Sequence, residues 1–126
     1  MLKKIHTDSA PASIGPYSQA IAVGDTLYTS GQIPVDPTTG KVVAATISQQ
    51  TEQVMKNLAA VLNEGNSDLQ HVIKTTCFLA NMSDFAEFNQ VYEVSFGEHK
   101  PARSCVAVKD LPLGVLVEIE AIAIIN

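Results

Sequence analysis

Residues 115–125 read VLVEIEAIAII, and this stretch decides the fold. Its β-branched and apolar residues are typical of a strand, in which successive side chains point to opposite faces. One face carries only apolar side chains: Val115, Val117, Ile119, Ala121, Ala123 and Ile125. The other face carries Leu116, Glu118, Glu120, Ile122 and Ile124. Because both faces are substantially apolar, we expect both to be covered.

Two helices are predicted before this strand, and they can cover one of its faces. Residues 48–64 place apolar side chains at helical spacing, and Gly65-Asn66 can close the helix. Ser83-Asp84 is a suitable start for a second helix that ends at Gly97. Its aromatic residues share one face: Phe85, Phe88, Tyr92 and Phe96.

Further strands are predicted on either side of these helices. Residues 21–23 and 27–30 flank the turn at Gly24-Asp25, which is a hairpin signal. Residues 71–80 and 103–109 are rich in strand-forming types, and a Leu-Pro-Leu-Gly turn at 111–114 precedes the last strand. Two prolines and a glycine predict a loop over residues 34–41.

The order of these elements indicates one α+β domain over residues 1–126, with two helices on one face of a sheet. No sequence is left to cover the second face, so a partner subunit is the economical source of cover. The alternative is a large exposed apolar patch, which monomers rarely tolerate. We therefore expect self-association.

Composition excludes several classes of protein. The chain has 126 residues, 46% hydrophobic and 17% charged, which argues against disorder. Its net charge of −5, without a lysine or arginine cluster, disfavours nucleic acid or an anionic membrane as the main partner. No apolar run reaches membrane-spanning length, and the N-terminal residues are too polar for a signal peptide. Free thiols at Cys77 and Cys105 suit a reducing, cytoplasmic location.

Arg103 is the only arginine, and it begins a predicted strand. One interpretation is a rim arginine with its head group in water. The other is a receptor for a carboxylate or phosphate, because the guanidinium offers a rigid fork of donors. Glu118 and Glu120 lie in what is expected to be the neighbouring antiparallel strand. One of them could be a salt-bridge partner of Arg103, or they could polarise a water or relay protons.

Other candidates for chemistry are weak. The three histidines, His6, His71 and His99, have no ligand spacing, and no glycine-rich phosphate loop is present, so neither a metal nor a cofactor is expected. Cys105, two residues from Arg103, could be an activated thiol, although an inert buried cysteine is the commoner state.

Four motifs together carry a resemblance to a known family. In chain order they are IGPYSQA (14–20), YTSGQIP (28–34), PARSCV (101–106) and VEIEAIA (117–123). With them the sequence resembles the RidA/YjgF family of reactive-intermediate deaminases, essentially from end to end. The resemblance implies a chorismate-mutase-like α+β fold with a mixed sheet, a cytosolic homotrimer and three clefts between subunits.

The same resemblance implies a cofactor-free activity and names the residues for it. The activity is hydrolysis of 2-imino acids, such as those released by the pyridoxal-phosphate enzymes threonine or serine dehydratase, to 2-keto acids and ammonia. Arg103 matches the carboxylate-binding arginine of the family, and Glu118 resembles the glutamate that holds the water. The other matching cleft positions are Tyr17, Ser30, Gly31, Asn89 and Cys105. Glu120 is then left as a structural partner.

Two other functions stay open at this point. The same cleft could bind a 2-keto acid as a sensor or carrier without turnover, because product and substrate share the carboxylate. Family members have also been described as ribonucleases acting on messenger RNA, for which the acidic balance of this chain is unsuited.

Overall fold

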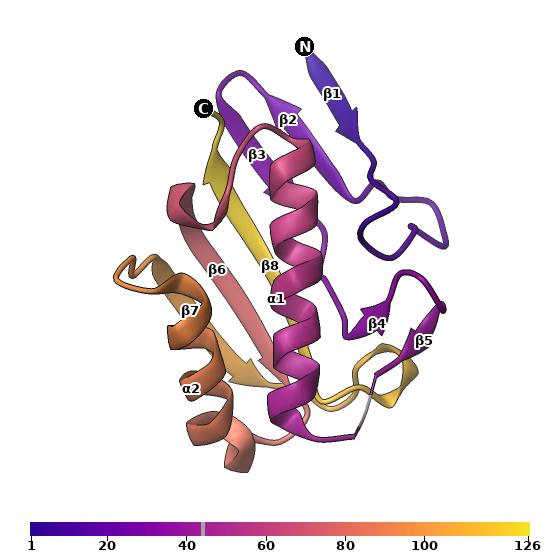
Figure 1. Cartoon of the computed structure of the whole chain (residues 1–126), viewed down its shortest axis with the longest axis vertical. Helices are drawn as coiled ribbons and strands as arrows, with labels where there is room; N and C mark the ends of the chain where they lie inside the picture. Colours follow the sequence, from indigo (N-terminus) through magenta and orange to yellow (C-terminus); the bar gives the residue numbers. More distant parts are fainter. Residues whose placement is uncertain (44) are drawn as a thin grey trace.

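The computed structural model describes residues 1–43 and 45–126, and within these residues the main sheet has six strands (Figure 1). Their order across the sheet is β1-β2-β3-β8-β6-β7. The bounds are β1 Leu2–Ile5, β2 Ala20–Val23, β3 Thr26–Thr29, β8 Val117–Ile124, β6 Val72–Leu79 and β7 Ala102–Ala107. The sheet is mixed, because β6 and β7 are parallel while the other pairs are antiparallel.

Strand β8 lies in the interior of the sheet, between β3 and β6. Its residues alternate as the sequence predicts. Val117, Ile119, Ala121 and Ala123 are buried. Glu118, Ile122 and Ile124 are partly exposed on the opposite face, and Glu120 is exposed. The prediction that one face of this strand forms the core is confirmed.

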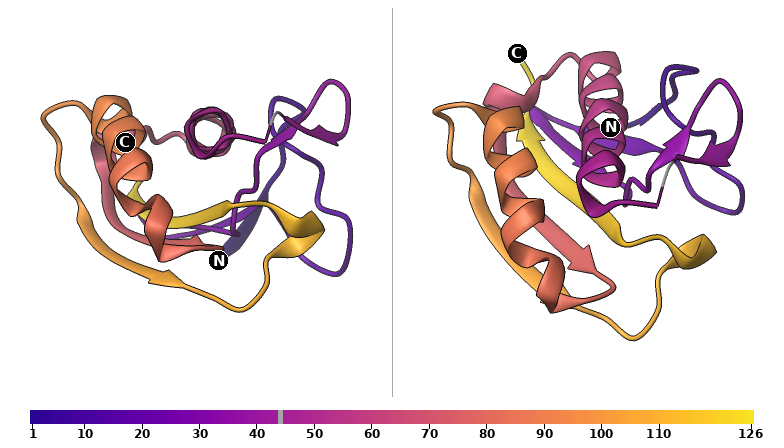
Figure 2. Two further views of the ribbon diagram at one scale, coloured as in Figure 1. Left: turned by 90° about the horizontal axis from the view of Figure 1, so that it is seen from below. Right: turned by 60° about the horizontal axis from the view of Figure 1, so that its bottom comes forward.

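Both helices pack on the same face of the sheet, as the sequence predicts (Figure 2). Helix α1 spans Ile47–Glu64, and the Thr46 side chain caps it by accepting a hydrogen bond from the Gln49 backbone. Helix α2 spans Phe85–Phe96 and ends at Gly97, whose φ of 65° is accessible to glycine without strain. The core lies between helices and sheet, and its largest side chains with almost no exposure include Leu58, Leu62, Phe88, Phe96 and Ile119.

Three parts of the structure differ from the prediction or go beyond it. Residues 34–41 are not wholly a loop, because β4 (Val35–Asp36) and β5 (Lys41–Val42) pair as a short antiparallel hairpin. The Asp36 carboxylate holds the turn between them by accepting from the backbone and hydroxyl of Thr38. Strand β1 has no counterpart in the prediction. Short 3₁₀ turns also occur at Leu69–His71, Met82–Asp84 and Pro112–Gly114.

The sheet face away from the helices carries several exposed apolar side chains. Tyr28 is 47% exposed, Ile73 48% and Val106 45%. Ile122 lies on the same face, directly opposite Tyr28. We call this surface the open face, and its cover by a partner subunit stays a prediction. In residues 1–43 and 45–126, no helix combines the length and the hydropathy that crossing a membrane requires.

Candidate active site

Arg103 lies on the edge strand β7 and points to the helix side of the sheet. Its guanidinium carbon stands 4.9 Å from the ring centre of Tyr92, 5.4 Å from Phe85 and 5.9 Å from Phe88. Its Nη1 donates a hydrogen bond of 2.7 Å to the side-chain oxygen of Asn89. The aromatic face of α2, predicted from helical spacing, therefore holds a cation as well as the core.

A pocket of about 200 Å³ opens beside this guanidinium. Its lining residues are Asn89, Tyr92, Glu93, Phe96, His99, Lys100 and Arg103. The carboxylate of Glu93 is paired with Lys100, at 3.9 Å, rather than with Arg103. The structure thus brings together two of the predicted site residues, Arg103 and Asn89. We call this pocket the Arg103 half-site.

A second group of predicted site residues meets in another cavity, separate from the Arg103 half-site. Tyr17, Ser30, Gly31 and Glu118 line an open cavity of about 580 Å³, together with Glu120 and Pro112. We call this cavity the Glu118 half-site. The Ser30 hydroxyl donates a hydrogen bond of 2.6 Å to the Ser18 carbonyl. This bond holds the segment that carries the neighbouring Tyr17.

The backbone brings Gly31 directly against Glu118. Gln32 and Ile119 exchange two backbone hydrogen bonds of 2.8 and 3.1 Å, which extend the pairing of β8 beyond β3. A Cβ at position 31 would overlap the Glu118 carboxylate and lie 2.8 Å from its Cδ. The sequence motif suggests that backbone approaches a ligand at Gly31. In this chain the group that approaches it is the Glu118 side chain.

The carboxyl group of Glu118 is the titratable group of this half-site with a perturbed pKa. Burial raises the pKa of Glu118 above its ordinary value, and the like charge of Glu120 raises it further. A carboxyl group that holds its proton more tightly than usual is a stronger base once it is ionised, which suits it to accept a proton from water.

Two expectations for the glutamates are wrong within this chain. Strand β6 separates β7 from β8, so the glutamates do not lie in the strand next to Arg103. Arg103 is level with Thr75 and Ala121 on the helix side, whereas Glu118 and Glu120 face the other way. A salt bridge from Arg103 to either is therefore excluded. Glu120 is exposed in the single chain and has no hydrogen-bond partner among the described residues, so its role as a structural partner stays a prediction.

Cys105 lies on the same side as Arg103, but it is not an activated thiol. Burial raises the pKa of Cys105, and the opposing effect of the nearby Arg103 is smaller. The fully buried Cys77 has its pKa raised to about 12 for the same reason. Both cysteines are thus protonated at neutral pH, which supports the inert interpretation. That the backbone at Cys105 helps to position the substrate, as the family resemblance implies, stays a prediction.

Sequence reasoning missed two buried amides that position the Glu118 half-site. The Gln19 side chain accepts from the Thr7 backbone and donates to three carbonyls in residues 7–11. Asn57 of α1 is completely buried and donates to the carbonyls of Ile33 and Val35. A polar residue inside the apolar stripe of α1 is the signal that could have identified Asn57. Gln19 belongs to the IGPYSQA motif, but the motif does not show that its side chain binds the loop over residues 7–11.

The histidines are engaged in other interactions, although His99 also lines the Arg103 half-site. His71 pairs with Asp68 at 2.7 Å, and His99 donates to the Val72 carbonyl at 2.6 Å. Over residues 1–43 and 45–126, no three histidine, cysteine, aspartate or glutamate side chains gather as metal ligands would.

Comparison with known proteins gives matches over nearly the whole chain. The family model described as Endoribonuclease L-PSP matches residues 7–125. A relative from Lactococcus lactis subsp. lactis (strain IL1403), named as the regulator AldR, is 54% identical over 97% of both chains. A protein from Salmonella typhimurium (strain LT2), named 2-iminobutanoate/2-iminopropanoate deaminase, is 47% identical over 98% of both chains.

Solved structures match equally well. The crystal structure of the yeast protein YEO7 has a TM-score of 0.97 and 48% identity, with 100% of both chains covered. The structure of Escherichia coli TdcF with bound serine has a TM-score of 0.94 and 42% identity, and covers 98% of this chain and 99% of that one. The α+β fold with two helices on a mixed sheet is thus shared with these proteins.

Proposed function

The chain belongs to the Endoribonuclease L-PSP family, which includes the RidA/YjgF proteins, and from this membership we propose that it is a hydrolytic deaminase of 2-imino acids. Its substrates are 2-iminobutanoate and 2-iminopropanoate, and its products are 2-keto acids and ammonia. The observation that carries the proposal is the Arg103 guanidinium. It has no carboxylate partner among the described residues, yet it is held in place beside a pocket.

The active site in this proposal is completed by a second copy of the chain. Arg103 and Glu118 face opposite sides of one sheet, so one chain cannot present both to a small substrate. A homotrimer in which the open face of one copy meets the Arg103 half-site of the next joins the two. The same contact covers the exposed apolar side chains of the open face.

Each half-site then has a distinct task. Arg103 binds the substrate carboxylate in a bidentate grip, and Asn89 with the aromatic rings keeps the guanidinium oriented. Tyr17 lies at the mouth of the Glu118 half-site, 52% exposed, with its hydroxyl available to the substrate. Glu118 orients the attacking water.

The reaction is a hydrolysis that needs no oxidant, reductant or cofactor. Water adds to the carbon of the protonated imine while Glu118 accepts one of its protons, which forms a carbinolamine. Glu118 returns this proton to the nitrogen and, once ionised again, accepts the hydroxyl proton as the C–N bond breaks and the carbonyl forms. The released ammonia takes that proton and leaves as ammonium, which restores the Glu118 carboxylate. General acid–base catalysis of this kind contributes typically ~10²–10⁴-fold. Orientation of water and imine contributes further.

A second candidate function is binding of a 2-keto or amino acid without turnover. It is favoured by the relative named as a regulator and by the TdcF structure with bound serine. The Arg103 half-site would recognise the carboxylate of either ligand. Ribonuclease activity, which the family description names, is disfavoured by the net charge of −5.

A trapping assay separates the two functions. Threonine dehydratase generates the imine, semicarbazide traps it, and the purified protein is added. A deaminase lowers the yield of trapped imine at constant threonine consumption, whereas a binding protein leaves it unchanged. The Arg103→Ala variant serves as the control, and we expect it to lose the effect while it keeps its fold.

A further inference from the structure

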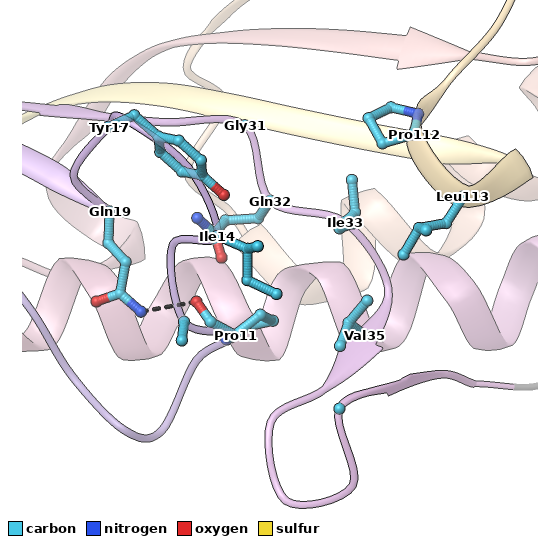
Figure 3. A pocket seen from close by; sticks show the side chains of 12 residues that line it. Pro11, Ile14, Tyr17, Gln19, Gly31, Gln32, Ile33, Val35, Pro112 and Leu113 are labelled. Atoms are coloured by element: carbon cyan, nitrogen blue, oxygen red, sulfur yellow. Dashed lines mark hydrogen bonds between the residues drawn. The ribbon is translucent and has the colours of Figure 1, made fainter.

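A second cavity, of about 320 Å³, adjoins the Glu118 half-site (Figure 3). The two cavities share four lining residues: Tyr17, Gly31, Ile33 and Pro112. The two cavities therefore meet at the wall that Tyr17 and Gly31 form, which places the second cavity within reach of a ligand held beside Glu118. We call this second cavity the Gln32 pocket, after one of the two glutamines that line it. Its size is at the lower end of the range for small-molecule sites.

The walls of the Gln32 pocket are held by the buried amides described above. Gln19 fixes the loop around Pro11 on one side through a 2.8 Å hydrogen bond, drawn in Figure 3. Asn57 fixes the chain from Ile33 to Val35 on the other side, at 3.0 and 2.9 Å. Because both walls are tied to buried groups, the pocket is formed before any ligand binds.

The carboxamide of Gln32 is the unusual feature of this pocket. Gln32 is only 5% exposed, and its backbone is fully engaged with Ile119. Its side-chain Nε2 makes one long contact of 3.5 Å to the Ser30 carbonyl, and its Oε1 accepts no hydrogen bond from a described residue. Figure 3 shows the carboxamide on the pocket side, near Tyr17 and Ile14 in this view. The side-chain atoms of Gln32 are not among the fully buried polar atoms without a partner, so its Oε1 reaches the cavity and is available there to a hydrogen-bond donor.

The rest of the lining restricts the chemistry of that ligand. The described residues that line the pocket include no charged side chain. A ligand carboxylate or ammonium would lose its hydration here without a counter-charge. Ile14 and Leu113 at the mouth are 91% and 73% exposed, and a bound hydrocarbon chain would cover them. Leu113 also has a φ of 58°, a backbone region costly for leucine, as expected where a side chain serves binding rather than stability.

We propose that the Gln32 pocket is a side-chain subsite for substrates with an unbranched chain ending in a carboxamide. The ligand amide pairs with the Gln32 carboxamide, its N–H donating to Oε1 and its carbonyl accepting from Nε2. The subsite rests on the proposed function, since the carboxylate end of the same ligand binds at Arg103. The chain thus acts on 2-imino acids of the glutamine type in addition to the short ones.

Binding of stable, non-cyclising acids tests the subsite without turnover. The probes are succinamate, glutaramate and adipamate. Each is compared with the dicarboxylate of the same length as its charged isostere and with the acid of the same length that ends in an isopropyl group as its apolar isostere. Calorimetric titration of the parent protein should show one of the amides binding about tenfold tighter than its isosteres, the size expected of a buried neutral hydrogen-bonded pair. 2-Ketobutyrate should compete with it.

The variant Gln32→Leu should lose the preference for the amide and prefer the apolar isostere, while 2-ketobutyrate binds as before. The exposed Gln90→Leu is the matched control and should keep the preference.

Three results would each overturn the subsite. They are equal binding of amide and isosteres by the parent protein, a preference for the amide that survives Gln32→Leu, and a lack of competition by 2-ketobutyrate. An absence of saturable amide binding would mean that the pocket holds water only. The parent protein alone suffices if Gln32→Leu fails to fold. The trapping assay with 2-iminobutanoate measures the deaminase activity independently of amide binding. A failure of the subsite can therefore be distinguished from a failure of the proposed function.

Discussion

The guanidinium of Arg103 is oriented by three aromatic rings and by Asn89 rather than by an acid. This arrangement leaves its remaining donors available to a ligand, because no carboxylate of the described chain neutralises it. It also explains why a lysine at this position would be a poor substitute. An ammonium group has neither the flat surface to stack on Tyr92 nor the fork to grip two oxygens.

We therefore expect Arg103→Lys to lower the rate of imine hydrolysis by roughly 10- to 100-fold, because a hydrogen bond to a charged group contributes about 1.5–3 kcal/mol. The semicarbazide assay measures the rate, and a melting curve controls for folding. Parent-like hydrolysis by Arg103→Lys would show that a bidentate grip on the carboxylate is unnecessary.

The raised pKa of Glu118 predicts a pH dependence with a definite sign. The base form of Glu118 is needed, so the rate should rise as pH increases through this raised pKa. Part of the elevation comes from Glu120, so Glu120→Gln should move the acidic limb of the kcat/KM profile to lower pH. In Glu118→Gln that limb should disappear along with most of the rate. A profile unchanged in Glu120→Gln would contradict the electrostatic coupling of the two carboxyl groups.

Two glycines are packed tightly against side chains of the sheet, and they have different roles: Gly31 lies against Glu118 of β8 and Gly65 lies against Leu27 of β3. Gly31→Ala forces the Glu118 carboxylate to move, so hydrolysis should fall sharply. Gly65, at the end of α1, faces the fully buried Leu27, and an added Cβ would lie 2.6 Å from one of its methyl carbons. Gly65→Ala should therefore cost about 1–3 kcal/mol of unfolding free energy through overpacking, with the rate nearly unchanged. Urea denaturation and the trapping assay separate these effects, and equal rates in the two variants would argue against them.

Asn57 of helix α1 supports the site through its hydrogen bonds to the backbone. It does so without contacting the substrate. Asn57→Leu leaves the carbonyls of Ile33 and Val35 without their donor, so we expect a loss of about 1–3 kcal/mol in unfolding free energy. The exposed Asn63→Leu is the matched control and should be close to neutral. If amide binding in the Gln32 pocket survives Asn57→Leu unaltered, then the wall does not depend on this residue.

The long elements were predictable because their patterns repeat over many residues. Helices α1 and α2 and strands β6 and β8 show clear periodicity in the sequence. Strand β1 was missed because three of its four residues are exposed and two are lysines. Strands β4 and β5 were missed because each has only two residues, too few to show alternation. Short edge elements are set by their partners rather than by their own pattern.

The grouping of the candidate site was less predictable than its members. Motifs identified Arg103 and Glu118, but whether two strands are neighbours depends on the order of the whole sheet. Because β8 inserts between β3 and β6, Arg103 and Glu118 fall on opposite faces. The Gln32 carboxamide, whose Oε1 accepts from no described residue, likewise becomes recognisable only in the folded chain.

Assembly can be tested on the complete protein. Light scattering should give three times 13.4 kDa, and Ile122→Lys on the open face should yield monomers that no longer hydrolyse imines. Val94→Lys is the control, because Val94 is 82% exposed on α2 and should tolerate the charge. A parent protein that stays monomeric at micromolar concentration would refute both the covered open face and the shared active site.

The position of β8 has a consequence for how this protein is made. Strands β1–β3 and the pair β6–β7 leave the ribosome first, but within the sheet only β8 joins them. The sheet can close only after residues 117–124 have emerged from the exit tunnel. A nascent chain stalled before Val117 exposes the edges of β3 and β6, and unpaired edges are templates for aggregation. Translation of this one strand thus commits the two halves to a single fold.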